Sequence, residues 1–169
     1  MARIVPEKGL DYLINAYKNL DTDMKLVIAG GASHTNSYYN EIIEKTKKDK
    51  RIVLTGFVQG EELQELYSNC YLYCLPSDVE GMPISLMEAM SYGRRCLTSD
   101  IEENTQVTGK YGITFKKSDI EDLKKQLEFA INKENKGKWK LPEEISSYIL
   151  KKYNWDNVVE KTKELYKKG

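Results

Sequence analysis

Short apolar segments alternate with helix-like segments along most of the chain, and this alternation limits the folds that it can adopt. The segments expected to form strands lie at 24–29, 52–54, 70–75, 96–99 and 113–115. Helical spacing of apolar residues is found at about 10–17, 36–49, 61–69, 83–92, 119–132, 142–153 and 155–166. Near-continuous apolar strands separated by helices are typical of a parallel sheet covered on both faces. The sequence therefore predicts a doubly wound, Rossmann-like α/β fold.

The amino end does not fit a complete fold of this kind. Residues 1–5 resemble the tail of a strand, whereas a doubly wound sheet places its first strand at the centre, in the strand order 3-2-1-4-5-6. We therefore expect a fragment whose preceding half is missing. With 169 residues and only a short polar stretch at 133–138, residues 1–169 are expected to form one domain.

Composition narrows the class of protein. The 26 basic residues balance 26 acidic ones, so nothing in the net charge indicates a nucleic-acid partner. Cys70, Cys74 and Cys96 lack metal-ligand spacing and lie in apolar segments, which favours reduced thiols in a cytoplasmic protein. No apolar stretch approaches the roughly 18 residues of a membrane span, which leaves contact with a membrane surface as an open alternative.

Polar and glycine-rich clusters follow the predicted strands. In open α/β sheets, ligands bind beyond the carboxyl ends of the strands, near the point where the strand order reverses. The clusters are Arg3 with Lys8, then residues 30–33, 56–58, 76–81 and 100–104. With the expected strand order, Arg3 and Lys8 would face the loop at 76–81.

The start of the helix predicted at 83–92 suits an anion. Pro83 lacks an N–H and fits the first helical position, which leaves the amides of Gly81, Met82, Ile84 and Ser85 available. With Arg3 and Lys8 added, the arrangement would suit a diphosphate, because both side chains donate hydrogen bonds to anionic oxygens. The alternative for Lys8 is a solvated residue of the first turn of its helix.

Two acids accompany this helix. Glu88 lies among apolar residues, so the helix is expected to be buried and the carboxylate to need a partner. A ribose diol is one candidate partner, and an ion pair with Arg94 or Arg95 is the other. Glu80 could accept hydrogen bonds from another hydroxyl group, or it could be an ordinary surface acid.

These residues carry a resemblance to a known family. The segment EGMPISLMEAMSYG at 80–93 resembles the E-x7-E signature of retaining GT-B glycosyltransferases of family four, also called glycosyl transferases group 1. RIVPEKG at 3–9 resembles the R-x4-K segment of that family. Further matches, in the expected order, are LVIAGG at 26–31, LTGFV at 54–58, TSDI at 98–101 and YNWD at 153–156. The resemblance spans nearly the whole chain and covers the carboxyl-terminal half of such an enzyme.

The resemblance implies a role for each candidate residue. Arg3 and Lys8 would hold the nucleotide diphosphate, Glu88 the ribose hydroxyls and Glu80 the hydroxyls of the transferred sugar. Other residues would contact the donor through their backbone: Gly81, Met82, Pro83 and Ile84 beside sugar and phosphate, Phe57 and Val58 beside the base, and Gly30 and Gly31 in a second loop. No metal or other cofactor is expected.

The implied function is that of an enzyme half. The domain would bind a UDP- or GDP-sugar for transfer of a hexose to a glycan or lipid-linked acceptor in polysaccharide biosynthesis, and it would be inactive without the amino-terminal acceptor domain. The full-length protein would be cytoplasmic and could contact the inner face of the membrane. The alternatives are a free-standing Rossmann-like binding or regulatory module, and a dinucleotide-dependent enzyme. The second alternative is disfavoured, because residues 6–9, which follow the first predicted strand, do not begin the G-x-G-x-x-G motif that such an enzyme needs there.

Overall fold

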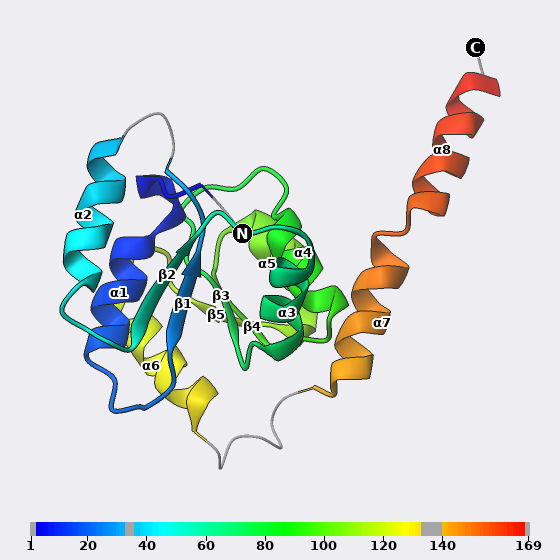
Figure 1. The fold of residues 1–169 in the computed structure, drawn as a ribbon. Coiled ribbons are helices and arrows are strands. Elements are labelled where there is room, and N and C mark those ends of the chain that lie inside the picture. Colours follow the sequence, from blue (N-terminus) through cyan, green and yellow to red (C-terminus); the bar gives the residue numbers. More distant parts are fainter. Residues whose placement is uncertain (1–2, 33–35, 133–139, 168–169) are drawn as a thin grey trace.

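The computed structural model describes residues 3–32, 36–132 and 140–167, which form parallel strands flanked by helices (Figure 1). β1 (Leu26–Ala29) pairs with β2 (Ile52–Gly56). β3 (Tyr73–Leu75), β4 (Cys96–Ser99) and β5 (Ile113–Phe115) form a second parallel sheet in that order.

Helices cover both faces of the strands. They are α1 (Leu10–Lys18), α2 (Asn36–Thr46), α3 (Gly60–Asn69), α4 (Ile84–Ser91), α5 (Glu102–Thr108), α6 (Ile120–Ile131), α7 (Pro142–Lys152) and α8 (Trp155–Lys167), with short 3-10 helices at Pro6–Lys8 and Gly109–Tyr111. One apolar core joins α1, α2 and α6 to the strands, and a second joins α3, α4, α5 and α7 to β3 and β4. The predicted α/β fold with helices on both faces is confirmed.

Among the described residues, the strand order within each sheet agrees with the prediction, but the expected first strand is reduced to a single bridge and is not paired with β3. Ile4 pairs in parallel with Ala32, and its N–H donates to the carbonyl of Gly31 at 3.0 Å. The β1–β2 and β3–β4–β5 ladders are therefore two separate hydrogen-bonded sheets in the part of the chain that is described.

α5 is a helix that was not predicted from the sequence. Its residues, EENTQVT, have no clear apolar stripe, and the helix is held by tertiary contacts, since Asn104, Val107 and Thr108 are buried. Packing has overridden weak local preference at this place.

α7 and α8 end the described chain. α7 packs on α4, and a Cβ at Gly93 would lie 2.7 Å from the carbonyl oxygen of Pro142. α8 extends away from the rest of the molecule (Figure 1). Among the described residues, no helix combines the length and the apolar character that a membrane crossing requires.

Candidate functional site

The segment that carries Lys8 lies directly on the loop after β3. Gly9 has φ +66°, and a Cβ at this position would stand only 2.1 Å from the carbonyl oxygen of Pro76. The N–H of Asp78 donates to the carbonyl of Glu7 at 2.9 Å. Only glycine allows the two backbones to approach so closely, and this contact brings Lys8 to the loop that follows β3.

Lys8 and Glu80 form an ion pair at this place. Lys8 Nζ donates to Glu80 Oε1 at 2.7 Å, and their side chains are 20% and 8% exposed. Ser77, which is fully buried, donates from its hydroxyl to the same oxygen at 2.7 Å. Both open alternatives from the sequence are therefore excluded, because Lys8 is not a solvated helix residue and Glu80 is not a surface acid.

A series of hydrogen bonds between buried polar residues supports the loop that carries Glu80. Asn104 donates from Nδ2 to the hydroxyl of Ser99 at 3.0 Å, and that hydroxyl donates to the backbone carbonyl of Ser77. All three residues have no exposed surface. The position of the Glu80 carboxylate thus depends on β4 and α5 as well as on its own loop.

Asp78 is a second anchor of the loop, and sequence reasoning gave it no role. Its carboxylate accepts from the hydroxyl of Tyr12 at 2.8 Å and from the hydroxyl of Ser118 at 2.9 Å. These partners are 66 and 40 residues away in the sequence. The local signal that pointed to the loop was its polar composition after an apolar strand.

Arg3 and the glycine loop lie at the same carboxyl edge of the strands. Arg3 is exposed and precedes Ile4, which is hydrogen-bonded to Gly31. The N–H of Gly30 donates to the carbonyl of Gly56 at 2.9 Å, and a Cβ at Gly31 would lie 3.6 Å from Phe57. The structure therefore places Arg3, Gly30, Gly31 and Phe57 together on this edge.

Val58, next to Phe57, has a buried side chain. Phe57 itself is 64% exposed. Three further apolar residues are exposed to a similar extent: Val79, Met82 and Ile84. An edge with this many exposed apolar groups is typical of a surface that receives a ligand or another domain.

The start of α4 differs from the prediction in two ways: the helix begins one residue later, and the amide of Ile84 is not available to a ligand. Pro83 is the residue before the helix rather than its first residue. The N–H of Ile84 already donates to the carbonyl of Met82 at 2.8 Å, because the chain makes a tight turn at Pro83. The predicted amide donor at Ile84 is therefore wrong for this conformation, while Gly81 has open space around its Cα.

Glu88 is exposed, so the prediction of a wholly buried helix is wrong. Leu86, Ala89 and Met90 face the core, whereas Ile84 and Glu88, one turn apart, lie on the open side of α4. The guanidinium of Arg94 donates to the backbone carbonyls of Tyr92 and Ser68, and that of Arg95 donates to the hydroxyl of Tyr71 at 3.1 Å.

The partner of Glu88 comes from α3. The hydroxyl of Tyr67 donates to Glu88 Oε2 at 2.8 Å. Burial, the neighbouring Tyr73 and the bond to Glu88 raise the pKa of the Tyr67 phenol far above its ordinary value, so it stays a proton donor. This contact fixes one carboxylate oxygen of Glu88 at the edge of the site.

In the part of the chain that is described, no three His, Cys, Asp or Glu side chains gather in a way that could hold a metal ion. The expectation that no metal takes part stays a prediction. Cys70, Cys74 and Cys96 are free thiols, and burial raises the pKa of the Cys74 thiol to about 12.

Comparison with known proteins identifies the family. Residues 1–152 match the family model described as Glycosyl transferases group 1. An uncharacterized glycosyltransferase of Methanocaldococcus jannaschii is 25% identical over 175 residues, covering 99% of this chain and 43% of that protein. The serotype-specific mannosyltransferase WbdA of Escherichia coli is 28% identical over 142 residues, covering 79% of this chain and 17% of that protein.

Solved structures agree on the fold. The Anabaena protein HepE, crystallised with UDP and glucose, superposes with a TM-score of 0.88 and 16% identity, covering 100% of this chain and 47% of that one. The chain thus spans less than half the length of these relatives. The family match and the fold together show that the chain belongs to the glycosyl transferases group 1 family and has the α/β fold of GT-B glycosyltransferases.

Proposed function

We propose that this chain is the donor-binding half of a retaining glycosyltransferase, which binds a nucleoside-diphosphate sugar at the carboxyl edge of its strands. The observation that carries the proposal is the Lys8–Glu80 pair, 2.7 Å apart, held against the loop that leads into α4. The contents of the related HepE crystal, UDP and glucose, support this class of ligand. UDP is the nucleotide that we favour, and GDP is the alternative.

Lys8 would serve both the phosphates and Glu80. An ammonium group has three N–H donors, and Glu80 uses one of them. The remaining two can reach phosphate oxygens, with Arg3 supplying a planar fork from the same edge and Gly81 and Met82 supplying backbone amides. Positive charge fixed around the leaving diphosphate would stabilise the transition state in which that charge develops.

Glu80 and Glu88 would recognise hydroxyl groups at opposite ends of the donor. The Glu80 carboxylate, held by Lys8 and Ser77, keeps lone pairs for the hydroxyls of the transferred sugar. Glu88 has one oxygen on Tyr67 and can accept a ribose diol with the other. Phe57 and Val58 would lie beside the base, near the loop of Gly30 and Gly31.

The proposal is tested by calorimetric titration of the chain with UDP, GDP and ADP, without metal. Lys8→Ala is expected to weaken binding by about 1.5 to 3 kcal/mol, the scale of a hydrogen bond to a charged group. Glu88→Ala is expected to weaken binding of the nucleoside diphosphates, whereas the matched control Lys151→Ala, at an exposed position of α7, should leave it unchanged. Far-UV circular dichroism checks that each variant is folded. Absence of binding by every nucleoside diphosphate to the folded chain would contradict the proposal.

The transfer reaction belongs to the longer protein. We propose that it moves a hexose to a glycan or lipid-linked acceptor with retention of anomeric configuration, in the cytoplasm and at the inner face of the membrane when the acceptor is a lipid. The chain alone is expected to bind donor without transferring sugar. NMR assignment of the anomeric proton in the product of the full-length enzyme tests retention, and an inverted product would contradict it.

A further inference from the structure

The carboxylate of Glu88 lies at an exposed position of α4, but a residue of another helix binds it. Its Oε2 atom accepts a hydrogen bond at 2.8 Å from the hydroxyl of Tyr67 on α3, and Tyr67 is only 5% exposed. Water can solvate an exposed carboxylate without help, so the bond is not needed to offset burial of Glu88. What the bond contributes is a fixed orientation of the carboxylate.

The ring of Tyr67 is itself held by its neighbours. It stacks on Tyr92 with the ring centroids 5.6 Å apart, and it lies tilted against Tyr73 at 6.1 Å. Leu63, one turn earlier on α3, packs with Tyr67 into the apolar core that α3 and α4 share. Close packing of this kind leaves a side chain little freedom. The hydroxyl that binds Glu88 is therefore a donor at a fixed place.

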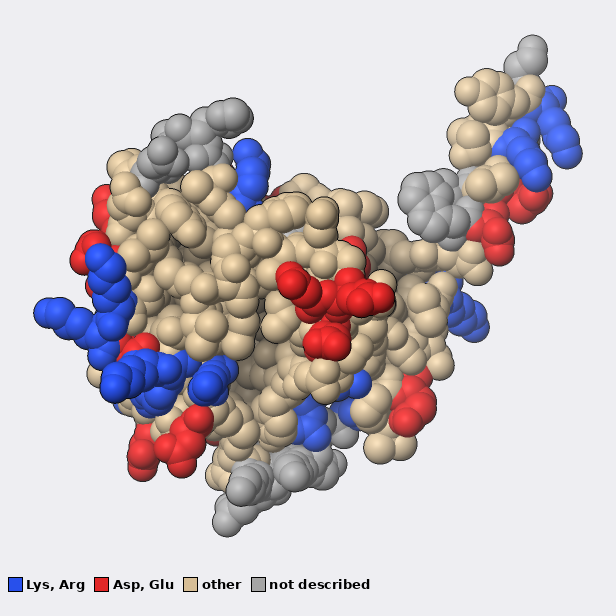
Figure 2. All heavy atoms as spheres, in the orientation of Figure 1, with Lys and Arg blue, Asp and Glu red and all other residues tan. Residues whose placement is uncertain are grey.

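The outward face of α3 is acidic and differs from the face that meets Glu88. Glu61, Glu62 and Glu65 are exposed there, and Figure 2 shows acidic side chains gathered over this helix. Their negative charge would repel an anionic nucleotide. The phenol of Tyr67 is uncharged, because burial raises its pKa far above the ordinary value. α3 thus contributes to the site through one neutral donor on its inner face.

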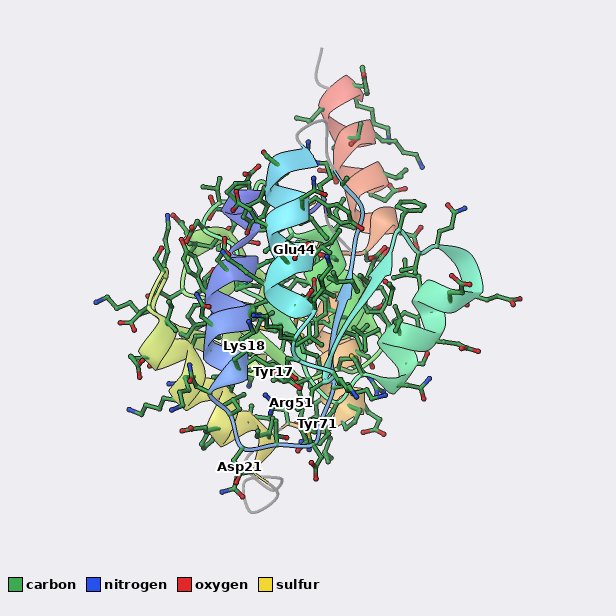
Figure 3. All side chains as sticks on the ribbon, turned by 60° about the vertical axis from the view of Figure 1, so that its left-hand side comes forward. Tyr17, Lys18, Asp21, Glu44, Arg51 and Tyr71 are labelled. Atoms are coloured by element: carbon green, nitrogen blue, oxygen red, sulfur yellow. The ribbon has the colours of Figure 1, made fainter. Side chains whose placement is uncertain are left out.

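Two other tyrosines provide matched references for Tyr67. Tyr73, in the same aromatic cluster, donates to the hydroxyl of Ser85 at 2.8 Å. Tyr17, on α1, is 5% exposed like Tyr67, donates to the backbone carbonyl of Met24, and has the guanidinium of Arg51 over its ring at 4.9 Å (Figure 3). Both hydroxyls therefore bond to groups other than Glu88.

A carboxylate that is already oriented suits the two adjacent hydroxyls of a ribose. A glutamate side chain has several rotatable bonds, and a free one loses rotamer entropy when a ligand orders it. Because Tyr67 orders Glu88 before any ligand binds, this cost is already met within the fold. The second oxygen, Oε1, keeps its lone pairs for hydroxyl donors.

Building on the proposed function, we propose that Tyr67 is a positioning residue that makes the site selective for ribose. It holds Glu88 Oε2, so that Oε1 is a preset acceptor for the 2′- and 3′-hydroxyls of the nucleoside. A 2′-deoxyribose has one hydroxyl fewer and leaves one of these bonds unmade. The site therefore takes ribonucleoside diphosphates in preference to 2′-deoxyribonucleoside diphosphates, and this preference depends on a residue that acts through Glu88.

The test measures by calorimetry the preference of the chain for UDP over 2′-deoxy-UDP, and for GDP over 2′-deoxy-GDP, as a ratio of dissociation constants. The unchanged chain is expected to show a ratio of about ten or more, the scale of one hydrogen bond to a charged group. Tyr67→Phe keeps the ring and removes the hydroxyl. It should lower the ratio at least about fivefold while changing the affinity for the 2′-deoxy ligand less than about twofold.

The controls Tyr73→Phe and Tyr17→Phe remove a hydroxyl that bonds elsewhere, and they should keep the ratio of the unchanged chain. Glu88→Gln, at an exposed position, should lower the ratio, and Tyr67→Phe added to it should lower the ratio no further, because the hydroxyl acts through the carboxylate. Far-UV circular dichroism checks that each variant is folded.

A ratio that Tyr67→Phe leaves unchanged, or that Tyr73→Phe lowers equally, would overturn the inference, and so would an undiminished ratio in Glu88→Gln. In each of these outcomes the unchanged chain still binds UDP or GDP. Failure of the proposed function is different, since the folded chain would then bind no nucleoside diphosphate at all.

Discussion

At the scale of single residues, the candidate site depends on a carboxylate that is almost buried. Burying the Glu80 side chain to 8% exposure is costly unless its charge is compensated. Lys8 supplies the opposite charge, and Ser77 supplies a second hydrogen bond to the same oxygen. The pair is therefore held by contacts that the protein makes in the absence of any ligand.

Ser77→Ala tests this support. Loss of the hydroxyl removes one hydrogen bond from Glu80, and we expect the free energy of unfolding to fall by about 0.5 to 1.5 kcal/mol. Denaturant titration measures the change. The matched variant Ser146→Ala, on α7, removes a hydroxyl that bonds only to the backbone of its own helix and should change stability less. Equal effects in the two variants would contradict the role given to Ser77.

The lowered pKa of Asp49 predicts that the stability of the fold depends on pH in the acid range. Hydrogen bonds from the side chain and backbone of Arg51 lower the pKa of this carboxyl from 3.8 to about 2. A carboxyl whose pKa is lower in the folded state contributes stability above about pH 4, and this contribution disappears as the pH falls toward 2. Thermal midpoints of the chain and of Asp49→Asn should therefore differ at pH 5 and converge near pH 2. A difference that persists unchanged to pH 2 would exclude this origin.

At the scale of elements, the turn between the first 3-10 helix and α1 determines where Lys8 lies. Gly9 ends the former and precedes α1, and its positive φ lets it approach Pro76. The expected strand order placed Lys8 opposite the loop at 76–81, and the Lys8–Glu80 contact agrees with that placement. The spacing of apolar residues in 10–17 predicted α1, but the close approach of Gly9 to Pro76, about 67 residues away, could not be read from local pattern.

Gly9→Ala should be more damaging than Gly60→Ala. Both glycines have positive φ, which costs an L-residue about 1 to 2 kcal/mol. Only at Gly9 does the new methyl also collide with backbone, whereas nothing lies within 4 Å at Gly60. We expect Gly9→Ala to lose about 1 to 3 kcal/mol more in chemical denaturation. Equal losses would show that the approach to Pro76 does not restrict this turn.

At the scale of the whole molecule, the strand order and the two helical layers were predictable because they depend on apolar runs and connection lengths that are visible in the sequence. The division into two sheets was not, since it depends on Ile4 making a single bridge. The exposure of Glu88 was also missed, because it depends on which side of α4 receives α7. Both departures from the prediction, the two separate sheets and the exposed Glu88, depend on contacts between elements that are distant in the sequence.

The two sheets are joined by shared helices, which predicts cooperative unfolding. Leu97 and Phe115, from β4 and β5, belong to the same core as α1, α6, β1 and β2. Leu123→Ala, at a fully buried position of α6, should cost about 2 to 5 kcal/mol, whereas Ile84→Ala at an exposed position should cost far less. Circular dichroism and hydrogen exchange at β2 and β4 should report the same transition. Separate transitions for the two sheets would contradict this coupling.

The Lys8–Glu80 contact has a consequence for selectivity under the proposed function. A cation and an anion that already neutralise each other attract a simple ion such as sulfate only weakly, because Glu80 repels what Lys8 draws in. A sugar diphosphate carries phosphate oxygens that can bind Lys8 and hydroxyl groups that can bind Glu80. The site at this pair would therefore favour a molecule that carries both groups, and free phosphate in the cell would be a poor competitor.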